Sequence, residues 1–270
     1  MMNTRKQCAY CGCTDRKITR EHLWPRSLHQ RLQKARGAKQ HLFWLSRLAK
    51  VVTTEPQLRD VCDVCNNGAL SCLDAYICVL WDQFFSHIHK CGEMVTFSYD
   101  YHLLCRWLLK QCYNSARIHE FDKFVYPPLT PYILNGSVPP IETRLFLQLA
   151  PPGLISVQEL EDMELPHDTP LRWEPEGHRV GFLYFTFDSR KKLLRAVHLR
   201  SYSFFLAFFQ PGATESEINE FVSVFTLQNK YVSHLLPGSD SIKLLCDGID
   251  AWHSIQGVRR KLVSQGSLRA

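Results

Sequence analysis

The sequence predicts an α+β protein with a metal-stapled N-terminal module, a helical segment and a β-rich mixed C-terminal domain. Two Cys-x-x-Cys pairs, at residues 8–11 and 62–65, are typical of a structural zinc site. Apolar residues recur at steps of three and four through residues 70–88, which indicates a helix. Beyond residue 143, stretches rich in aromatic and β-branched residues predict strands.

The two cysteine pairs are expected to bind one structural Zn²⁺ ion. Zinc takes four ligands in a tetrahedron, and a Cys-x-x-Cys turn directs two sulfur atoms at one ion. The chain has eleven Cys, and its N-terminus lacks the apolar core of a secretory signal, so we expect thiols in a reducing cytoplasm. Most cysteines outside the pairs lie among apolar residues and are expected to be buried. The expected zinc ligands are Cys8, Cys11, Cys62 and Cys65.

Helix signals occur at three places. The first helix is expected to begin right after Asn66-Asn67-Gly68, at Leu70, and to stop near Gly92. A second helix is expected after Ser98, which is a candidate N-cap residue. The Thr-Glu-Ser-Glu sequence at residues 214–217 is a capping box, which predicts the start of a third helix.

Strand signals dominate the C-terminal half, where proline-rich segments separate them. The expected strands are 143–149, 180–188 and 193–209, with 189–192 as a hairpin turn, and 231–236 with 242–246 as a second hairpin. The chain is therefore divided into a metal module (1–74), a helical segment packing on it (75–125) and a mixed α+β domain of unknown role (126–270).

Positive charge is concentrated in the first fifty residues. They hold twelve Lys and Arg against two acidic residues, a net charge of +10, whereas the rest of the chain carries −4. A basic segment that coincides with a metal motif is the electrostatic footprint of a nucleic-acid-binding protein. Trp24 and Trp44 lie in this segment and are candidates for stacking on bases. The candidate contacts to nucleic acid are Arg20, Arg26, Lys34, Arg36 and Lys39.

Glu21, His22 and Asn66 are the candidate catalytic residues. Adjacent side chains on an extended backbone point to opposite sides, so Glu21 can bind a cation while His22 faces a substrate. Oxygen atoms of Glu21 and Asn66 suit Mg²⁺ or Mn²⁺, and two protein ligands leave room for water and phosphate. Such an ion polarises a phosphate and stabilises the leaving oxygen, while His22 takes a proton from the attacking water.

These residues resemble the zinc-containing HNH endonucleases, which have the ββα-metal fold. The matching pattern is Cys8-x-x-Cys11, Glu21-His22-x-x-Pro25-x-Ser27-Leu28 and Cys62-x-x-Cys65-Asn66-Asn67-Gly68. The chain is more narrowly similar to a bacterial subgroup with a Cys-Asn-Asn-Gly signature. In that subgroup a serine, an acidic residue and then a helix with Trp and Lys follow, as Ser71, Asp74, Trp107 and Lys110 do here.

The resemblance implies a role for each motif residue. His22 would be the general base, Glu21 and Asn66 would hold the catalytic ion, and the four cysteines would hold zinc. Glu21 stands where Asp is commoner. The middle Asn of the family, which pins the loop carrying the base, has no clear counterpart. Gln57 stands about where it would be, and Asp60 or Arg59 are the other candidates.

The function implied by the resemblance is metal-dependent hydrolysis of the DNA backbone, leaving 3′-hydroxyl and 5′-phosphate ends. Defence against foreign DNA is a role that follows by analogy with HNH proteins. The C-terminal domain would supply target choice, dimerisation or a protein partner. Two alternatives stay open: a zinc-stapled nucleic-acid-binding or partner-binding module without hydrolysis, and an RNA-directed nuclease. A membrane partner is not expected, because no run approaches the ~18–20 apolar residues of a membrane span.

Overall fold

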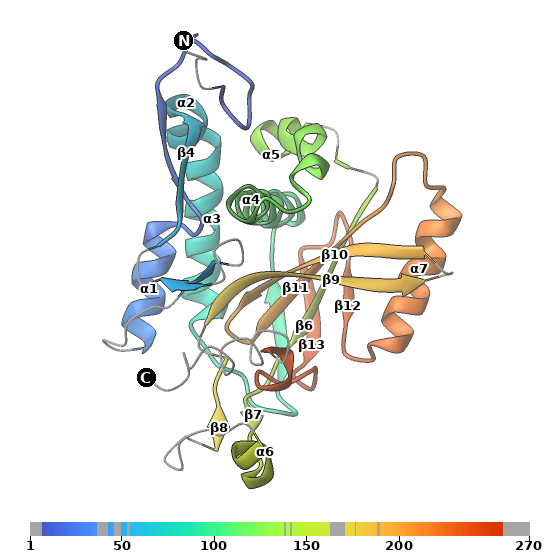
Figure 1. The fold of residues 1–270 in the computed structure, drawn as a ribbon. Helices are drawn as coiled ribbons and strands as arrows, with labels where there is room; N and C mark the ends of the chain where they lie inside the picture. Colours follow the sequence, from blue (N-terminus) through green and yellow to red (C-terminus); the bar gives the residue numbers. More distant parts are fainter. Residues whose placement is uncertain are drawn as a thin grey trace.

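The protein has a mixed α+β architecture in which helices surround several antiparallel sheets (Figure 1). The computed structural model describes residues 7–36, 43–45, 50–52, 55–137, 139–140, 142–162, 171–175, 177–187 and 190–255. Within these residues, no helix combines the length and the apolar character needed to cross a membrane.

The N-terminal part is a two-stranded antiparallel sheet that leads directly into a helix. Strand β1 (Ile18–His22) pairs with β4 (Gln57–Cys62), and α2 (Asp63–Cys65) follows without a loop. Between the strands lie α1 (Arg26–Arg36) and a short hairpin of β2 (Phe43–Leu45) and β3 (Lys50–Val52).

The first long helix starts where the periodicity predicts, and a short helical turn at the second cysteine pair precedes it. After α2 comes a π-helical turn (Asn66–Leu70), then α3 (Ser71–Leu80) and a second π-helical turn (Trp81–Phe85). The expected start at Leu70 is confirmed, because Leu70 is the N-cap residue of α3. The second cysteine pair forms a separate helical turn before the kink. Cys62 caps it, since its sulfur accepts from the Cys65 backbone N–H. Gly68 has φ −98° and ψ −109° and kinks the helix at this point.

Helix α4 (Tyr101–His119) lies at the centre of the molecule, with thirteen of its nineteen residues buried (Figure 1). Its N-cap is Asp100, whose carboxylate accepts from the backbone N–H of Leu103 at 2.8 Å. The expected cap, Ser98, is instead the last residue of β5 (Met94–Ser98). The prediction of a helix here is correct, but its cap lies two residues later because Ser98 still belongs to the strand.

A five-stranded antiparallel sheet fills the C-terminal half, in the order β12-β6-β11-β10-β9. Its strands are β6 (Thr143–Leu149), β9 (His178–Phe187), β10 (Arg190–Leu199), β11 (Tyr202–Phe208) and β12 (Ser233–Leu235). Alternate residues face opposite sides of a strand. Tyr202, Phe204 and Leu206 thus join the core around α4, while Phe205 and Ala207 join a second core under α7 (Glu215–Gln228). Because both faces are covered at β11, all seven of its residues are buried.

Two strand predictions are wrong. The expected strand 193–209 is two strands, which reverse at Arg200 and Ser201, where Arg200 has φ 52°. The expected second hairpin does not form either. Strand β12 adds to the edge of the sheet beside β6, whereas β13 (Ser241–Leu245) pairs with β5. The capping box at Thr214 is confirmed at the start of α7.

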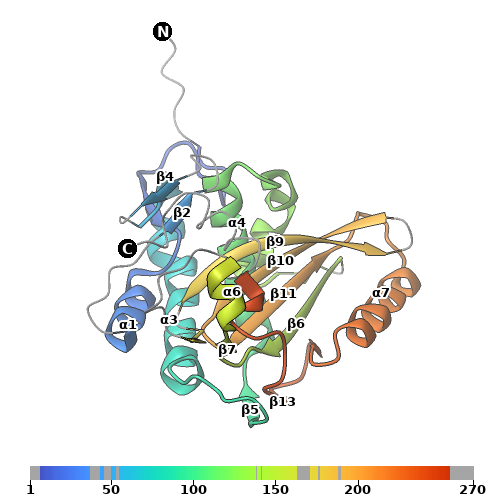
Figure 2. The same cartoon turned by 60° about the horizontal axis from the view of Figure 1, so that its bottom comes forward.

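Smaller elements complete the chain. Strands β7 (Gly153–Leu154) and β8 (Arg172–Trp173) form a short pair with α6 (Val157–Asp162), which comes forward in Figure 2. The others are α5 (Thr130–Asn135) and 3₁₀ turns at Lys123–Val125, Pro127–Leu129 and His253–Ile255. The largest buried cluster draws on residues from Cys8 to Cys246. The division at residues 74 and 125 stays a prediction.

Candidate functional site

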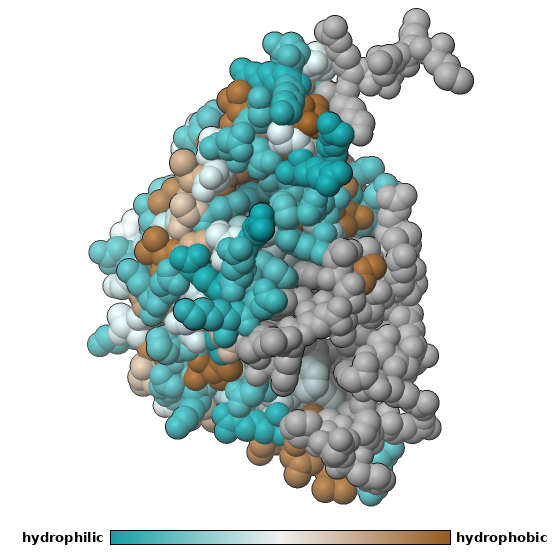
Figure 3. All heavy atoms as spheres, turned by 90° about the vertical axis from the view of Figure 1, so that its left-hand side faces the viewer, coloured by the Kyte–Doolittle hydropathy of each residue, from teal (hydrophilic) through white to brown (hydrophobic). Residues whose placement is uncertain are grey.

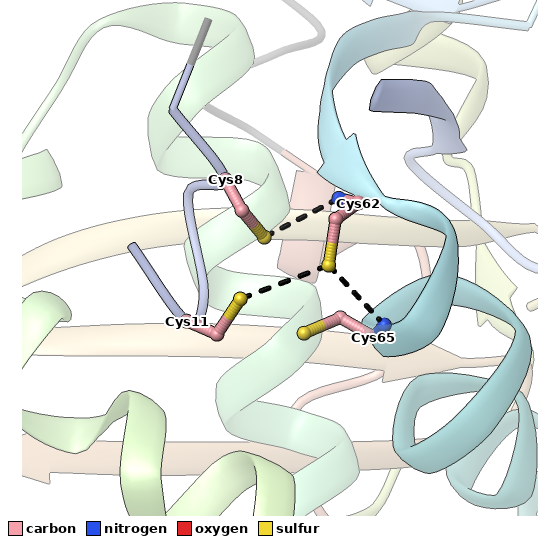
Figure 4. A group of neighbouring side chains, drawn as sticks. All are labelled: Cys8, Cys11, Cys62 and Cys65. Carbon is pink, nitrogen blue, oxygen red and sulfur yellow. Dashed lines mark hydrogen bonds between the residues drawn. The ribbon is translucent and has the colours of Figure 1, made fainter. Parts of the chain in front are cut away.

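Four cysteines converge from the two predicted pairs (Figure 4). The sulfur atoms of Cys8, Cys11, Cys62 and Cys65 all lie within 4.8 Å of one another. Sulfur atoms in tetrahedral contact with one zinc ion, at Zn–S distances of about 2.3 Å, would be about 3.8 Å apart. The Cys11 and Cys62 sulfur atoms are 3.7 Å apart, so the donor set fits a metal ion such as zinc.

Local backbone geometry places these sulfur atoms. The first pair turns at Gly12, whose φ of 74° favours glycine, and the Gly12 N–H donates to the Cys8 carbonyl at 2.9 Å. Backbone N–H groups also point at sulfur: Cys62 N–H donates to Cys8 Sγ at 3.3 Å, and Cys65 N–H to Cys62 Sγ at 3.5 Å. Burial opposes ionisation of Cys62, but these N–H and thiol neighbours outweigh it and lower the pKa of Cys62 to about 6.

The remaining cysteines carry free thiols, and four of the seven are buried, as expected from their apolar surroundings. The buried ones are Cys78, Cys105, Cys112 and Cys246, whereas Cys72 and Cys91 are exposed and Cys13 is half-buried.

Glu21 points into the protein, toward α4. It is only 5% exposed, and its Oε1 accepts from Lys110 Nζ and from Asn114 Nδ2, both at 3.1 Å. Lys110 is 1% exposed and also donates to both carboxylate oxygens of Asp74, at 2.6 and 2.7 Å. Trp107 Nε1–H donates to Asp74 at 3.1 Å. The four residues of this group are called the buried ion network below: Glu21, Asp74, Lys110 and Asn114.

In the buried ion network, two carboxylates share one ammonium group. Burial raises the pKa of Asp74, although Lys110 opposes this effect. Burial alone would lower the pKa of Lys110, but Asp74 and Glu21 outweigh it and raise that pKa. The amide of Asn114 is oriented by Tyr10, whose hydroxyl donates to Asn114 Oδ1 at 2.7 Å. Glu21 is therefore held rigidly by groups more than eighty residues away in the chain.

His22 faces the other way, as expected from strand alternation, and its side chain is 33% exposed. Its Nδ1 lies 2.7 Å from Oε2 of Glu55, a residue that the sequence analysis missed. Nothing in the local sequence around Glu55 indicates this contact, which forms across 33 residues.

The three candidates for the missing middle residue behave differently. Gln57 Nε2 lies 3.5 Å from His22 Nδ1, at the limit of a hydrogen bond. Asp60 instead pairs with Arg117 of α4, and Arg59 is exposed on β4. Glu55 therefore makes the shortest contact with His22, and the expectation that Asp60 or Arg59 fixes this loop is not supported by their positions.

Asn66 is held against β1. Its side-chain amide donates to Thr19 Oγ1 at 3.0 Å and to the Arg20 carbonyl at 2.9 Å. The pairing of β1 with β4 shifts register between Thr19 and Glu21, so Arg20 sits at this irregularity. The Asn66 amide nitrogen donates to the Arg20 carbonyl at this irregularity. The amide oxygen of Asn66 is therefore the atom that can bind an ion.

The face of the molecule beside α1 and β4 is largely hydrophilic among the described residues (Figure 3). Arg20, Arg26 and Lys34 are exposed, as a nucleic-acid contact requires. The side chain of Arg36 and all of Lys39 lie outside the described residues, as does the Trp44 side chain. Trp24 is not a stacking platform, because it is 2% exposed and packs against Trp107 with ring centroids 6.0 Å apart.

A scan against models of protein families finds no match, and neither a search of curated proteins nor a search of solved structures finds one. The case for a function therefore depends on the residues and their geometry.

Proposed function

We propose that the protein is a metal-dependent endonuclease of the HNH class that hydrolyses DNA, and that its N-terminal part is a ββα-metal module. The observation that carries the proposal is the succession of β1, β4 and a helix around one four-cysteine cluster. Glu21 and His22 stand at the end of the first strand, and Asn66 on the first helical turns contacts that strand.

The contacts of the resemblance residues support the proposal further. Asp74, Trp107 and Lys110 are separate in the sequence motif, yet Trp107 and Lys110 both donate to Asp74, and Lys110 also contacts Glu21. These three motif residues therefore form one hydrogen-bonded group beside Glu21, the candidate metal ligand. This shared contact is a physical reason for them to occur together.

His22 would act as the general base. Its side chain is 33% exposed and its Nδ1 is engaged by Glu55, so Nε2 is the nitrogen that would accept a proton from the attacking water. The attacking water gives its proton to Nε2 and its oxygen forms the new bond to phosphorus. The P–O3′ bond then breaks, and the leaving oxygen takes a proton from solvent.

Glu21 and Asn66 are the residues that would hold Mg²⁺ or Mn²⁺. A bound divalent ion would supply Lewis-acid stabilisation of charge on the phosphate. Among the described residues, the contacts of Glu21 use Oε1, so Oε2 is the oxygen that an ion can approach. Arg20, Arg26 and Lys34 would contact backbone phosphates on the exposed side.

The test is cleavage of supercoiled plasmid by purified protein with Mg²⁺ or Mn²⁺. His22→Ala should lower the cleavage rate by about 10²–10⁴-fold, because it removes the general base. Its zinc content and circular dichroism should be unchanged. His87→Ala is the matched control, since His87 is exposed on a distant part of the chain. Equal cutting by His22→Ala and the wild type would refute the proposal.

A zinc-stapled binding module without hydrolysis is the second candidate. The pairing of Glu21 with Lys110 favours it, because the ammonium group engages the carboxylate that a catalytic ion needs. This reading predicts nucleic-acid binding that weakens steeply with salt, with no cleavage of duplex DNA, single-stranded DNA or RNA under any divalent ion. Cleavage of RNA alone would identify an RNA-directed nuclease instead. Action in the cytoplasm, in defence against foreign DNA, is part of the proposal for the nuclease.

A further inference from the structure

We infer that Glu55 is a positioning residue for His22, and that it takes the place of the middle Asn absent from the motif. The inference rests on the proposed nuclease function. Glu55 lies just before β4, on the segment that closes the long connection between the two strands. The Glu55 carboxylate makes two contacts at the end of β1. Its Oε2 contacts His22 Nδ1 at 2.7 Å, and its Oε1 accepts from the Trp24 backbone N–H at 3.2 Å.

This double contact fixes the loop that carries the base. The adjacent backbone adds a third link, since the Leu23 N–H donates to the Pro56 carbonyl at 3.0 Å. Residues 22–24 are thus tied to residues 55–56 by one side chain and one backbone bond. The Glu55 side chain is 12% exposed, so water competes weakly for its oxygen atoms.

The contact also selects the tautomer of the neutral imidazole. An ionised carboxylate only accepts hydrogen bonds, so Nδ1 must carry the proton that joins His22 to Glu55. Neutral His22 then has its lone pair on Nε2, the nitrogen that can receive a proton from the attacking water. When Nε2 takes that proton, the ring becomes an imidazolium, and the carboxylate stabilises its positive charge while staying ionised.

The other groups near His22 cannot do this. Glu21 is turned inward and paired with Lys110, and Gln57 is neutral and 3.5 Å from Nδ1. A carboxylate in short contact with the ring is provided by Glu55 among the described residues.

Steady-state cleavage kinetics and ¹⁵N NMR of the His22 ring in the full chain test the inference together. Glu55→Ala should lower kcat by about 10–100-fold, as loss of an orienting partner typically does. KM should stay within about twofold, because Glu55 does not contact the substrate. The wild-type spectrum should show a protonated Nδ1 and an unprotonated Nε2, whereas Glu55→Ala should show a mixture of tautomers.

Two further variants keep the test decisive. Glu55→Gln preserves shape but supplies one acceptor for two donors, so it should fold even if Glu55→Ala does not, with a smaller loss of kcat and a mixed tautomer. Glu220→Ala is the matched control, because Glu220 is exposed on α7, and it should keep both the rate and the tautomer. A Glu55 variant with wild-type kcat and an unchanged Nδ1–H signal would overturn the inference.

The NMR measurement separates this inference from the proposed function. If the wild type cleaves nothing, the nuclease proposal fails, while an Nδ1–H that depends on Glu55 still establishes the contact. If the wild type cleaves and only His22→Ala is inactive, the nuclease proposal stands and the role of Glu55 is refuted.

Discussion

The paired strands β1 and β4, called the N-terminal sheet below, and the five-stranded C-terminal sheet are stabilised by different interactions. The five-stranded sheet buries apolar side chains on both faces, against α4 on one side and α7 on the other. In the N-terminal sheet the buried apolar residues are Val61 and Cys62. This sheet also depends on sulfur atoms and buried ions: the cysteine cluster at one end and the buried ion network along its inner face. Loss of one metal ligand or one buried charge should therefore lower the stability of the N-terminal sheet far more than that of the five-stranded sheet.

Loss of the metal ion should have the largest effect. Structural zinc contributes about 10–16 kcal/mol to the folding of zinc-finger peptides at pH 7, and here it would join residues 54 positions apart. Cys62→Ser, or a strong chelator, should remove the bound metal and abolish hydrogen-exchange protection in residues 8–65. Amides of β6 and β11 should stay protected, because their core is apolar.

Cys72→Ser is the matched control for that experiment, since Cys72 is exposed and outside the cysteine cluster. It should leave metal content and exchange unchanged. About one metal ion per chain is expected in the wild type, and equal metal content in Cys62→Ser and the wild type would rule out the cluster as the binding site.

Removal of the buried ammonium group should be next in size. Lys110→Met keeps a long side chain but leaves the buried Glu21 and the half-buried Asp74 without a cation, which should cost about 3–5 kcal/mol of unfolding free energy. Arg31→Met is the comparison, because the Arg31–Asp82 pair is exposed and should cost about 0.2–1 kcal/mol. Urea denaturation measures both. A smaller loss for Lys110→Met than for Arg31→Met would mean that the network contributes little.

The sheet should show a modest dependence on acid. Burial, together with the nearby charge of Arg144, lowers the pKa of His234 to about 4. The folded state therefore prefers the neutral ring, so this stability is present above about pH 6.5 and is lost as pH falls toward 4. Because His234 is only partly buried, we expect a loss of about 1–2 kcal/mol between pH 7 and 4. His234→Gln should flatten that part of the stability profile, and His87→Gln should not.

Local signals predicted the parts of the structure that local interactions determine. The cysteine pairs, β6 and the capping box of α7 each depend on residues a few positions apart, and each appears where its pattern indicates. The reversal at Arg200 was missed because no Gly, Asn or Asp marks the turn, and Ser201 is only a weak turn signal within an apolar run.

The contacts around the candidate site could be predicted only in part. Alternation along β1 explains why Glu21 and His22 face opposite sides, but it says nothing of what each one meets. Glu55 reaches His22 across a loop, and Asn114 reaches Glu21 from 93 residues away. Such contacts depend on how α4 packs against the N-terminal sheet, and no local sequence pattern encodes that packing.

The distance in sequence between Glu21 and its partners also affects the order in which parts of the chain can fold during translation. The fourth cysteine, Cys65, emerges from the ribosome 49 residues before Asn114. At about 5–20 residues per second, α4 becomes available roughly 2–10 s later. During that interval the cysteines can already bind metal, while Glu21 still faces water and has no buried cation beside it. We therefore expect the N-terminal sheet to close around its sulfur atoms first, and the buried side of the candidate site to be completed once α4 is available.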